Sequence, residues 1–176
     1  MNGKLVAVIL AVLAITAAGG CLLYAPANVT LKLMDPPPQS YDSSITSITV
    51  TFSKIEIHSA GGGNASGWHT LMTSGTVNLL TVLNVSKALS TTSIPAGKYT
   101  EIRFFISQTI ITINGVNVGY SVPSANQTGF KVPITGGGLQ VIGGLSGSVT
   151  LDLAFKDSEI LNNPSLILNP VATATA

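Results

Sequence analysis

The sequence predicts an all-β domain that follows an apolar N-terminal segment. After about residue 28, apolar and polar residues alternate with the period of two that places successive side chains on opposite faces of a strand. Turn residues separate these runs, most clearly the dipeptide Asn114-Gly115, and the chain has no alternation of strands with helices. These observations predict an antiparallel β-sandwich, or a partly closed barrel, of about eight to ten strands.

The N-terminal segment predicts export across a membrane. Lys4 precedes an apolar run from Leu5 to Ala18, and small residues follow as far as Gly20. A positive charge, an apolar stretch and small residues in this order are typical of a secretory signal. We therefore assign residues 1–27 to a signal peptide or membrane-anchor helix. Residues 28–176 form a domain that we expect on the outer face of the cell membrane or at the cell surface.

Three fates of this segment are open. The sequence Ala18-Gly19-Gly20-Cys21 resembles a lipobox, in which Cys21 would carry a lipid anchor, although Leu is usual where Ala18 stands. The stretch from Leu5 to Ala25 is about 21 residues long, which is enough to span a bilayer uncut. Cleavage after Ala27 would instead release the protein.

The composition argues against two classes of protein, those stabilised by disulfides and those that bind nucleic acid. Cys21 is the only cysteine, so the domain has no internal disulfide and depends on core packing. Only 9% of the residues are charged, against about 25% in typical domains. The net charge is +1 without a basic patch, which argues against nucleic acid as a partner.

Glycans are expected to contribute to solubility in place of charge. The chain has four N-glycosylation sequons, and their glycosylation is a hypothesis that fits an exported, sparsely charged chain. The low charge, the missing disulfide and the Ile-rich strands together indicate an archaeal cell surface that faces acid, where carboxylates are protonated. The acceptor asparagines of the sequons are Asn28, Asn64, Asn84 and Asn126.

The first half of the domain predicts four strands. Val29 to Leu33 alternates and ends at the prolines 36–38, which cannot continue a strand. In the next strand the apolar positions change parity between Phe52 and Ile55, which requires a β-bulge near Ser53-Lys54. After a Gly-rich loop, the further strands cover Trp68–Leu71 and Val77–Leu80, and Thr81–Leu89 is expected to form one helical turn.

The second half begins with a turn at Pro95 and a long strand that contains Ile102, Phe104 and Ile106. A hairpin at Asn114-Gly115 follows. The remaining expected strands are Phe130–Val132, Val149–Phe155 and Leu166–Val171, with an Ala-Thr tail after them.

The sequence resembles the DUF4382 family, a domain of unknown function in exported prokaryotic and archaeal proteins that are often lipoproteins. The resemblance covers roughly residues 29–171 and implies the fold and the location, without any catalytic residue. It is carried by Leu33–Pro36 with Tyr41-Asp42, Val50–His58, Trp68 with Val77–Leu80, Ile94–Arg103, and Asn169–Val171.

No constellation of catalytic residues is recognisable, and we expect neither an enzyme nor a cofactor. Asp152, Asp157 and Glu159 are better explained as a solvated strand edge than as a calcium site. His58 and His69 lack a third zinc ligand nearby in the sequence. Asp35 and Asp42 are interpreted as turn-capping residues. Two aromatic residues, Trp68 and Tyr120, are candidate ligand-binding residues, although packing is the plainer interpretation of Trp68.

Three functions remain open. The first is structural or adhesive display of a glycosylated β-sandwich, with surface glycans or envelope proteins as partners. The second is a surface lipoprotein that binds carbohydrate or another small ligand. The third is a filament subunit joined by donor strands, which is disfavoured because the first strand follows the apolar segment so closely.

Overall fold

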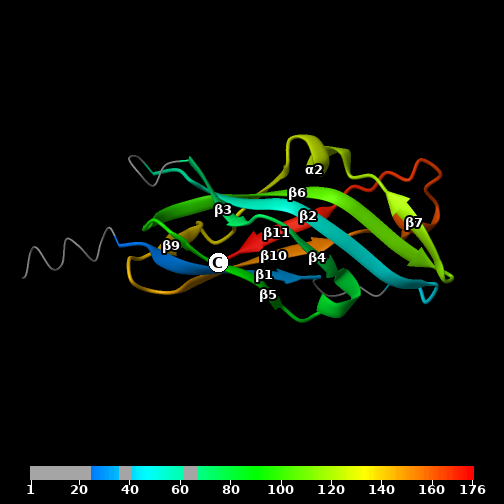
Figure 1. The fold of residues 1–176 in the computed structure, drawn as a ribbon, viewed down its shortest axis with the longest axis horizontal. Coiled ribbons are helices and arrows are strands. Elements are labelled where there is room, and N and C mark those ends of the chain that lie inside the picture. The colour runs from blue at the N-terminus through cyan, green and yellow to red at the C-terminus, as the bar shows by residue number, and fades with distance from the viewer. Residues whose placement is uncertain (1–24, 36–40, 62–66) are drawn as a thin grey trace, which may run out of the picture.

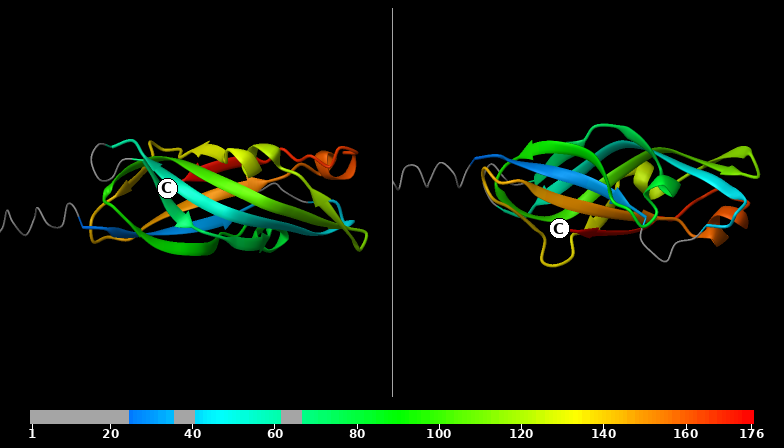
Figure 2. Two further views of the ribbon diagram at one scale, coloured as in Figure 1. Left: turned by 45° about the horizontal axis from the view of Figure 1, so that its top comes forward. Right: turned by 90° about the horizontal axis from the view of Figure 1, so that it is seen from below.

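The computed structural model describes residues 25–35, 41–61 and 67–176 and shows two β-sheets packed on each other (Figure 1). The strands of both sheets run along the long axis of the molecule (Figure 2). The elements are β1 (Ala27–Met34), β2 (Ile45–Ser59), β3 (Gly67–Met72), β4 (Gly75–Asn78), η2 (Leu79–Val82), β5 (Lys87–Ile94), β6 (Gly97–Ile113), β7 (Val116–Tyr120), α2 (Pro123–Gln127), β8 (Phe130–Pro133), β9 (Leu139–Val141), β10 (Gly147–Ala154), α3 (Asp157–Leu161) and β11 (Val171–Thr175).

The smaller sheet has the strand order β11-β10-β1-β5. β1 pairs in antiparallel orientation with β5 but in parallel with β10, where Val29 lies opposite Gly147. The expectation of a wholly antiparallel domain is therefore wrong at this one pairing. β1 and β10 are far apart in the sequence, so no hairpin turn constrains their relative direction.

The larger sheet is built on the long strands β2 and β6, which are antiparallel neighbours over most of their length. β3 and β4 pair with the free edge of β2, and β7, β8 and β9 pair with β6. The pairing of β2 with β6 shifts register around Phe52 and Lys54, which confirms the predicted bulge. The extra residue allows Phe52 and Ile55, which differ in parity, both to face the core.

One hydrophobic cluster lies between the sheets. From the smaller sheet it includes Leu31 and Leu151, and from the larger sheet Ile57 and Phe104, all completely buried. The rings of Phe52 and Phe104 meet edge to face with centroids 6.2 Å apart. The two sheets remain separate, so the structure is a two-layer sandwich and the partly closed barrel is wrong.

The hairpin at Asn114-Gly115 is confirmed. Ile113 pairs with Val116 across a two-residue turn, and Asn114 and Gly115 have φ values of 49° and 80°. Asn and Gly adopt this left-handed conformation more readily than other residues, which is why the dipeptide specifies the turn.

The described residues hold eleven strands rather than the expected eight to ten. Two local predictions, the helical turn and the final strand, are also wrong. The helical turn is η2, at Leu79–Val82, which begins two residues earlier than expected, and the last three residues of the expected turn, from Lys87, belong to β5. The Asn78 side chain caps η2 by accepting a hydrogen bond from the Leu80 amide at 3.1 Å. The final strand is β11, formed by the Ala-Thr tail, because that tail pairs with the edge of β10.

The sandwich has two distinct ends. The N-terminal end contains the start of β1, the turn between β5 and β6 and the loop between β9 and β10. The distal end contains the β6–β7 turn and α3 (Figure 1). Within the described residues, no helix has the length and apolar character needed to cross a membrane. The expected anchor helix, Cys21 and Asn64 lie outside those residues.

Candidate functional site

The outer surface of the larger sheet, near the N-terminal end, carries a group of aromatic and charged side chains that we call the Trp68 face. Strand register brings them together, since His58 pairs with Trp68 and Glu56 with Arg103. The chain has only eight basic and seven acidic residues, so this is a local concentration of charge. The Trp68 face consists of Lys54, Glu56, His58, Trp68, Arg103, Phe105 and Lys131.

Arg103 is at the centre of this face. Its guanidinium carbon lies 4.1 Å from the centroid of the Trp68 ring and 5.1 Å from that of Phe105. The same guanidinium donates two hydrogen bonds to Glu56 Oε2, from Nη2 at 2.6 Å and from Nε at 3.1 Å. Charge-assisted bonds of this kind hold the Arg103 side chain in one orientation.

Glu56 is the buried anion of the group, with 7% of its surface exposed. Burial acts to raise its pKa, but hydrogen bonds from Arg103 and Lys54 outweigh that effect and hold the pKa below its usual range. Lys54 Nζ lies 3.0 Å from Glu56 Oε1 and 4.8 Å from the centroid of the Phe105 ring. The carboxylate is therefore shared by two cations that both lie over aromatic rings.

Gly129 makes room for this arrangement. It has φ of +77°, and a Cβ atom at this position would lie 2.6 Å from Arg103 Cγ and 2.8 Å from Phe105 Cζ. Only glycine satisfies both the backbone conformation and the close approach. Trp68 is further flanked by the His58 ring, with centroids 4.9 Å apart, and by Lys131 Nζ at 5.8 Å.

This face offers flat aromatic surface and fixed charges of both signs. Trp and Arg are enriched among the residues that contribute most to binding energy at protein interfaces. Aromatic rings also stack on the apolar faces of sugar rings. The arrangement is therefore suited to noncovalent recognition of a protein or glycan surface.

Tyr120, the second candidate residue, is elsewhere and has a different environment. It lies about 25 Å from Trp68 along the strand direction, because its partner Thr109 is several residues further along β6. Its side chain is buried, and its hydroxyl donates to the carbonyl of Ile160 at 2.7 Å. These contacts favour a packing role for Tyr120.

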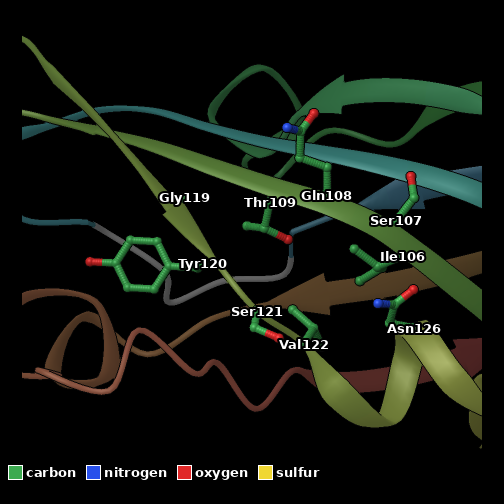
Figure 3. A pocket seen from close by; sticks show the side chains of 9 residues that line it. All are labelled: Ile106, Ser107, Gln108, Thr109, Gly119, Tyr120, Ser121, Val122 and Asn126. Carbon is green, nitrogen blue, oxygen red and sulfur yellow. The ribbon is translucent and has the colours of Figure 1, made fainter.

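A hollow of about 360 Å³ lies beside Tyr120, between β6, β7 and the start of α2 (Figure 3). Ser107, Ser121 and Asn126 contribute polar groups to its wall. The Tyr120 hydroxyl points away from these groups (Figure 3). The buried Thr109 hydroxyl has no hydrogen-bond partner among the described residues. Unlike the Trp68 face, the hollow has no charged side chain in its lining.

The two histidines do not form a shared site. His58 packs on Trp68 at the outer surface, whereas the His69 ring lies 5.6 Å from that of the buried Tyr99. The neighbouring positions of His69 and Trp68 on β3 place their side chains on opposite sides of the sheet. Among the described residues, no group of three or more His, Cys, Asp or Glu is placed to hold a metal ion.

The distal carboxylates serve as hydrogen-bond acceptors. Asp42 Oδ1 accepts from the Ser44 amide at 2.8 Å, as a turn-capping residue should. Asp157 accepts from the Asp42 amide, Glu159 from the Asn169 amide and Asp152 from the Thr173 hydroxyl, each at 3.0 Å. Asp157 and Glu159 are in α3, but Asp152 is on β10, which lies between β11 and β1, so the interpretation as a strand edge is wrong for Asp152.

Asp35 differs from the turn-capping role expected for it. Its side chain is completely buried and accepts a hydrogen bond of 2.7 Å from the Tyr41 hydroxyl. Burial raises its pKa from 3.8 to about 6, and the Tyr41 hydrogen bond opposes part of this rise. Its other oxygen, Oδ1, has no hydrogen-bond partner among the described residues.

The candidate glycosylation residues Asn28, Asn84 and Asn126 are all exposed. Asn28 is on β1, Asn84 follows η2 and Asn126 is in α2, so none belongs to the Trp68 face.

Most of the Trp68 face was not anticipated from the sequence. The outward positions of Arg103 and Phe105 were visible in the alternation of the long strand. Glu56 and Lys131 come from other strands, and only the strand pairing reveals that they flank Arg103.

The fold and this surface define a two-sheet β domain with a preorganised aromatic and charged face. The chain belongs to the DUF4382 family, described as a domain of unknown function, whose model matches residues 26–170. No curated protein and no solved structure matches the chain.

Proposed function

We propose that this protein is a non-catalytic adhesion module of the cell envelope, tethered by its N-terminus, and that the Trp68 face is its contact surface. The observation that carries the proposal is the Arg103 guanidinium, held by Glu56 and stacked on Trp68 at an accessible sheet face. The tether is the apolar segment Leu5–Ala25, acting as a membrane helix or through a lipid on Cys21.

The fixed geometry of the Trp68 face indicates that its charges serve to bind a partner and not only to keep the protein soluble. A solubilising surface charge needs no fixed geometry, and exposed ion pairs contribute only about 0–1 kcal/mol to stability. Here the side chains of Glu56 and Arg103 are 9% and 22% exposed, and a glycine is required to accommodate them. A rigid Arg-Trp pair loses little side-chain entropy when a partner binds.

A second candidate function is carbohydrate binding by the same face. It is favoured by the two aromatic rings, Trp68 and Phe105, whose centroids lie 4.1 Å and 5.1 Å from the guanidinium carbon of Arg103. Stacking on a ring and hydrogen bonding to a fixed guanidinium are both suited to a saccharide. The donor-strand filament has less support, because β1 lies between β10 and β5 within its own sheet.

The test is binding of the full chain, displayed on beads, to envelope fragments of the source cells. We expect Trp68→Ala and Arg103→Lys each to weaken binding by about tenfold or more, the effect typical of an interface hot spot. Lys32→Ala, on the outer surface of the smaller sheet, is the matched control and should bind like the unchanged protein. Equal binding by all folded variants would refute the proposal.

Periodate treatment of the envelope fragments separates the two candidates. It cleaves vicinal diols, so it abolishes recognition of most glycans and leaves protein partners largely intact. Loss of binding after periodate identifies a glycan ligand, and retention identifies a protein ligand. Unfolding of each variant, followed by circular dichroism because Trp68→Ala removes the one tryptophan, verifies that the domain remains folded.

A further inference from the structure

An apolar turn is exposed at the N-terminal end of the sandwich, between β9 and β10. The Leu145 amide donates to the Ile142 carbonyl at 3.1 Å, which closes the turn, and Gly144 has the positive φ of 76° that this geometry requires. The side chains of Ile142 and Leu145 are 51% and 59% exposed. Two large apolar side chains are thus presented to the surroundings by a four-residue turn.

The turn is joined directly to the chain that leads to the proposed tether. The Gly144 amide donates to the Pro26 carbonyl at 3.4 Å. Pro26 immediately follows the apolar segment Leu5–Ala25. In Figures 1 and 2 the orange loop after β9 lies beside the blue start of β1 in every view. A membrane that holds the segment is therefore close to this turn.

The surrounding surface is compatible with a lipid headgroup layer. Lys98 is exposed at this end, where it pairs with Gln140 of β9. The nearest acidic side chain along β6 is Glu101, about 13 Å from the first residue of that strand. Glu56 is bonded to Arg103 on the Trp68 face, and the other acidic residues, Asp35, Asp42, Asp152, Asp157 and Glu159, lie toward the distal end.

We propose that the Ile142–Leu145 turn inserts into the interfacial region of the outer leaflet and sets the orientation of the domain on the membrane. This inference rests on the tether of the proposed function. The apolar side chains would lie at the boundary of headgroups and acyl chains, as those of interfacial segments do, and Lys98 would lie among the phosphates. Because the strands run along the long axis, the sandwich stands away from the membrane with its distal end outermost.

Tryptophan quenching in reconstituted vesicles tests the insertion. The chain has one tryptophan, so a full-length Trp68→Phe parent provides a blank on which single tryptophans can be introduced. Leu145→Trp reports on the turn. Val116→Trp is the matched control, because Val116 is 62% exposed at the start of β7, next to the β6–β7 turn at the distal end. The vesicles contain phosphatidylcholine brominated in its acyl chains, which quenches tryptophan at short range.

We expect Leu145→Trp to lose roughly half of its emission in brominated vesicles relative to unbrominated ones, and Val116→Trp to lose none. If both proteins float with the vesicles but Leu145→Trp is not quenched, the insertion is overturned and the tether stands. A blue-shifted Leu145→Trp emission without quenching would indicate contact with protein and overturns it as well. Failure of the chain to float with vesicles would overturn both the insertion and the tether.

If the Trp68→Phe protein does not fold, Leu145→Trp and Val116→Trp can be introduced into Trp68→Tyr instead, and the same comparison is made.

Discussion

Asp35 offers the most direct test of how burial in this fold controls a charge. It lies at the distal end of β1, completely buried, with one oxygen bonded to Tyr41 and the other without a hydrogen-bond partner among the described residues. Replacing it by asparagine, Asp35→Asn, keeps the shape of the side chain and an oxygen that can accept from Tyr41. The substitution removes the ability to ionise and places an amide NH2 group where the second carboxyl oxygen was.

The pKa of Asp35 predicts the direction of the effect. The folded protein holds this carboxyl with a pKa of about 6, whereas an unfolded chain ionises it near 3.8. Between these values the folded state binds more protons than the unfolded state, so stability falls as the pH rises. The contribution is fully present below about pH 4 and is lost above about pH 6.

The magnitude follows from the same two values. At about 1.4 kcal/mol per pKa unit, a pKa raised from 3.8 to about 6 corresponds to at most about 3 kcal/mol. Local relaxation and water around the ionised group reduce this, so we expect a loss of about 1–3 kcal/mol between pH 4 and pH 7. Glu56 and Asp42 have lowered pKa values, so their contributions are lost on acidification, mainly below about pH 4.5.

The assay is urea unfolding of the full chain in detergent micelles, followed by the fluorescence of Trp68, at intervals from pH 4 to pH 7. The quantity to compare is the free energy of unfolding of the unchanged protein minus that of Asp35→Asn. This difference should decline with rising pH. Asp152→Asn is the control, since it removes a carboxylate from the outer surface of the smaller sheet. If the difference for Asp35→Asn is flat across this range, the buried carboxyl does not titrate as argued.

Two further predictions concern packing. Gly129→Ala should lower the free energy of unfolding by about 2–4 kcal/mol and change the Trp68 fluorescence, because a Cβ would collide with Arg103 in a left-handed backbone. The control Gly137→Ala, with φ of +90° and open space around it, should lower the free energy of unfolding by only about 1–2 kcal/mol. Equal losses of stability in the two variants would contradict the steric argument. Thr109→Val should stabilise the domain by about 1 kcal/mol, because it removes a buried hydroxyl without a partner among the described residues. Thr92→Val, which loses a 2.8 Å bond to the Leu71 carbonyl, should instead cost about 1 kcal/mol, and chemical unfolding measures both.

The fold was predictable where local chemistry decides the conformation. Asn114-Gly115 specifies its own turn through two left-handed residues, and the change of parity after Phe52 required a bulge whatever strand lay beside it. The C-terminal tail was misjudged because its Thr residues alternate with Ala, which is depleted in strands, so the segment carries a weak strand signal by itself. Pairing with β10 supplies the hydrogen bonds that make it a strand.

The candidate site was predictable only in part. Trp68 was identified from its residue type, but the partners that give it a function, Arg103 and Glu56, come from strands whose register is a long-range property. Tyr120 was proposed on the same grounds and lies buried with its hydroxyl bonded to Ile160. Residue type alone does not distinguish an aromatic ring on an outer face from one that closes the core.

By itself, the sequence determined the all-β class, the family and the apolar segment that precedes the domain, because these depend on local patterns of hydrophobicity and turn residues. Tertiary structure decided the parallel pairing of β1 with β10, the burial of Asp35 and the assembly of the Trp68 face. It also placed the Ile142–Leu145 turn beside Pro26. Each of these joins residues that are distant in the chain, and their proximity depends on how two whole sheets register and pack.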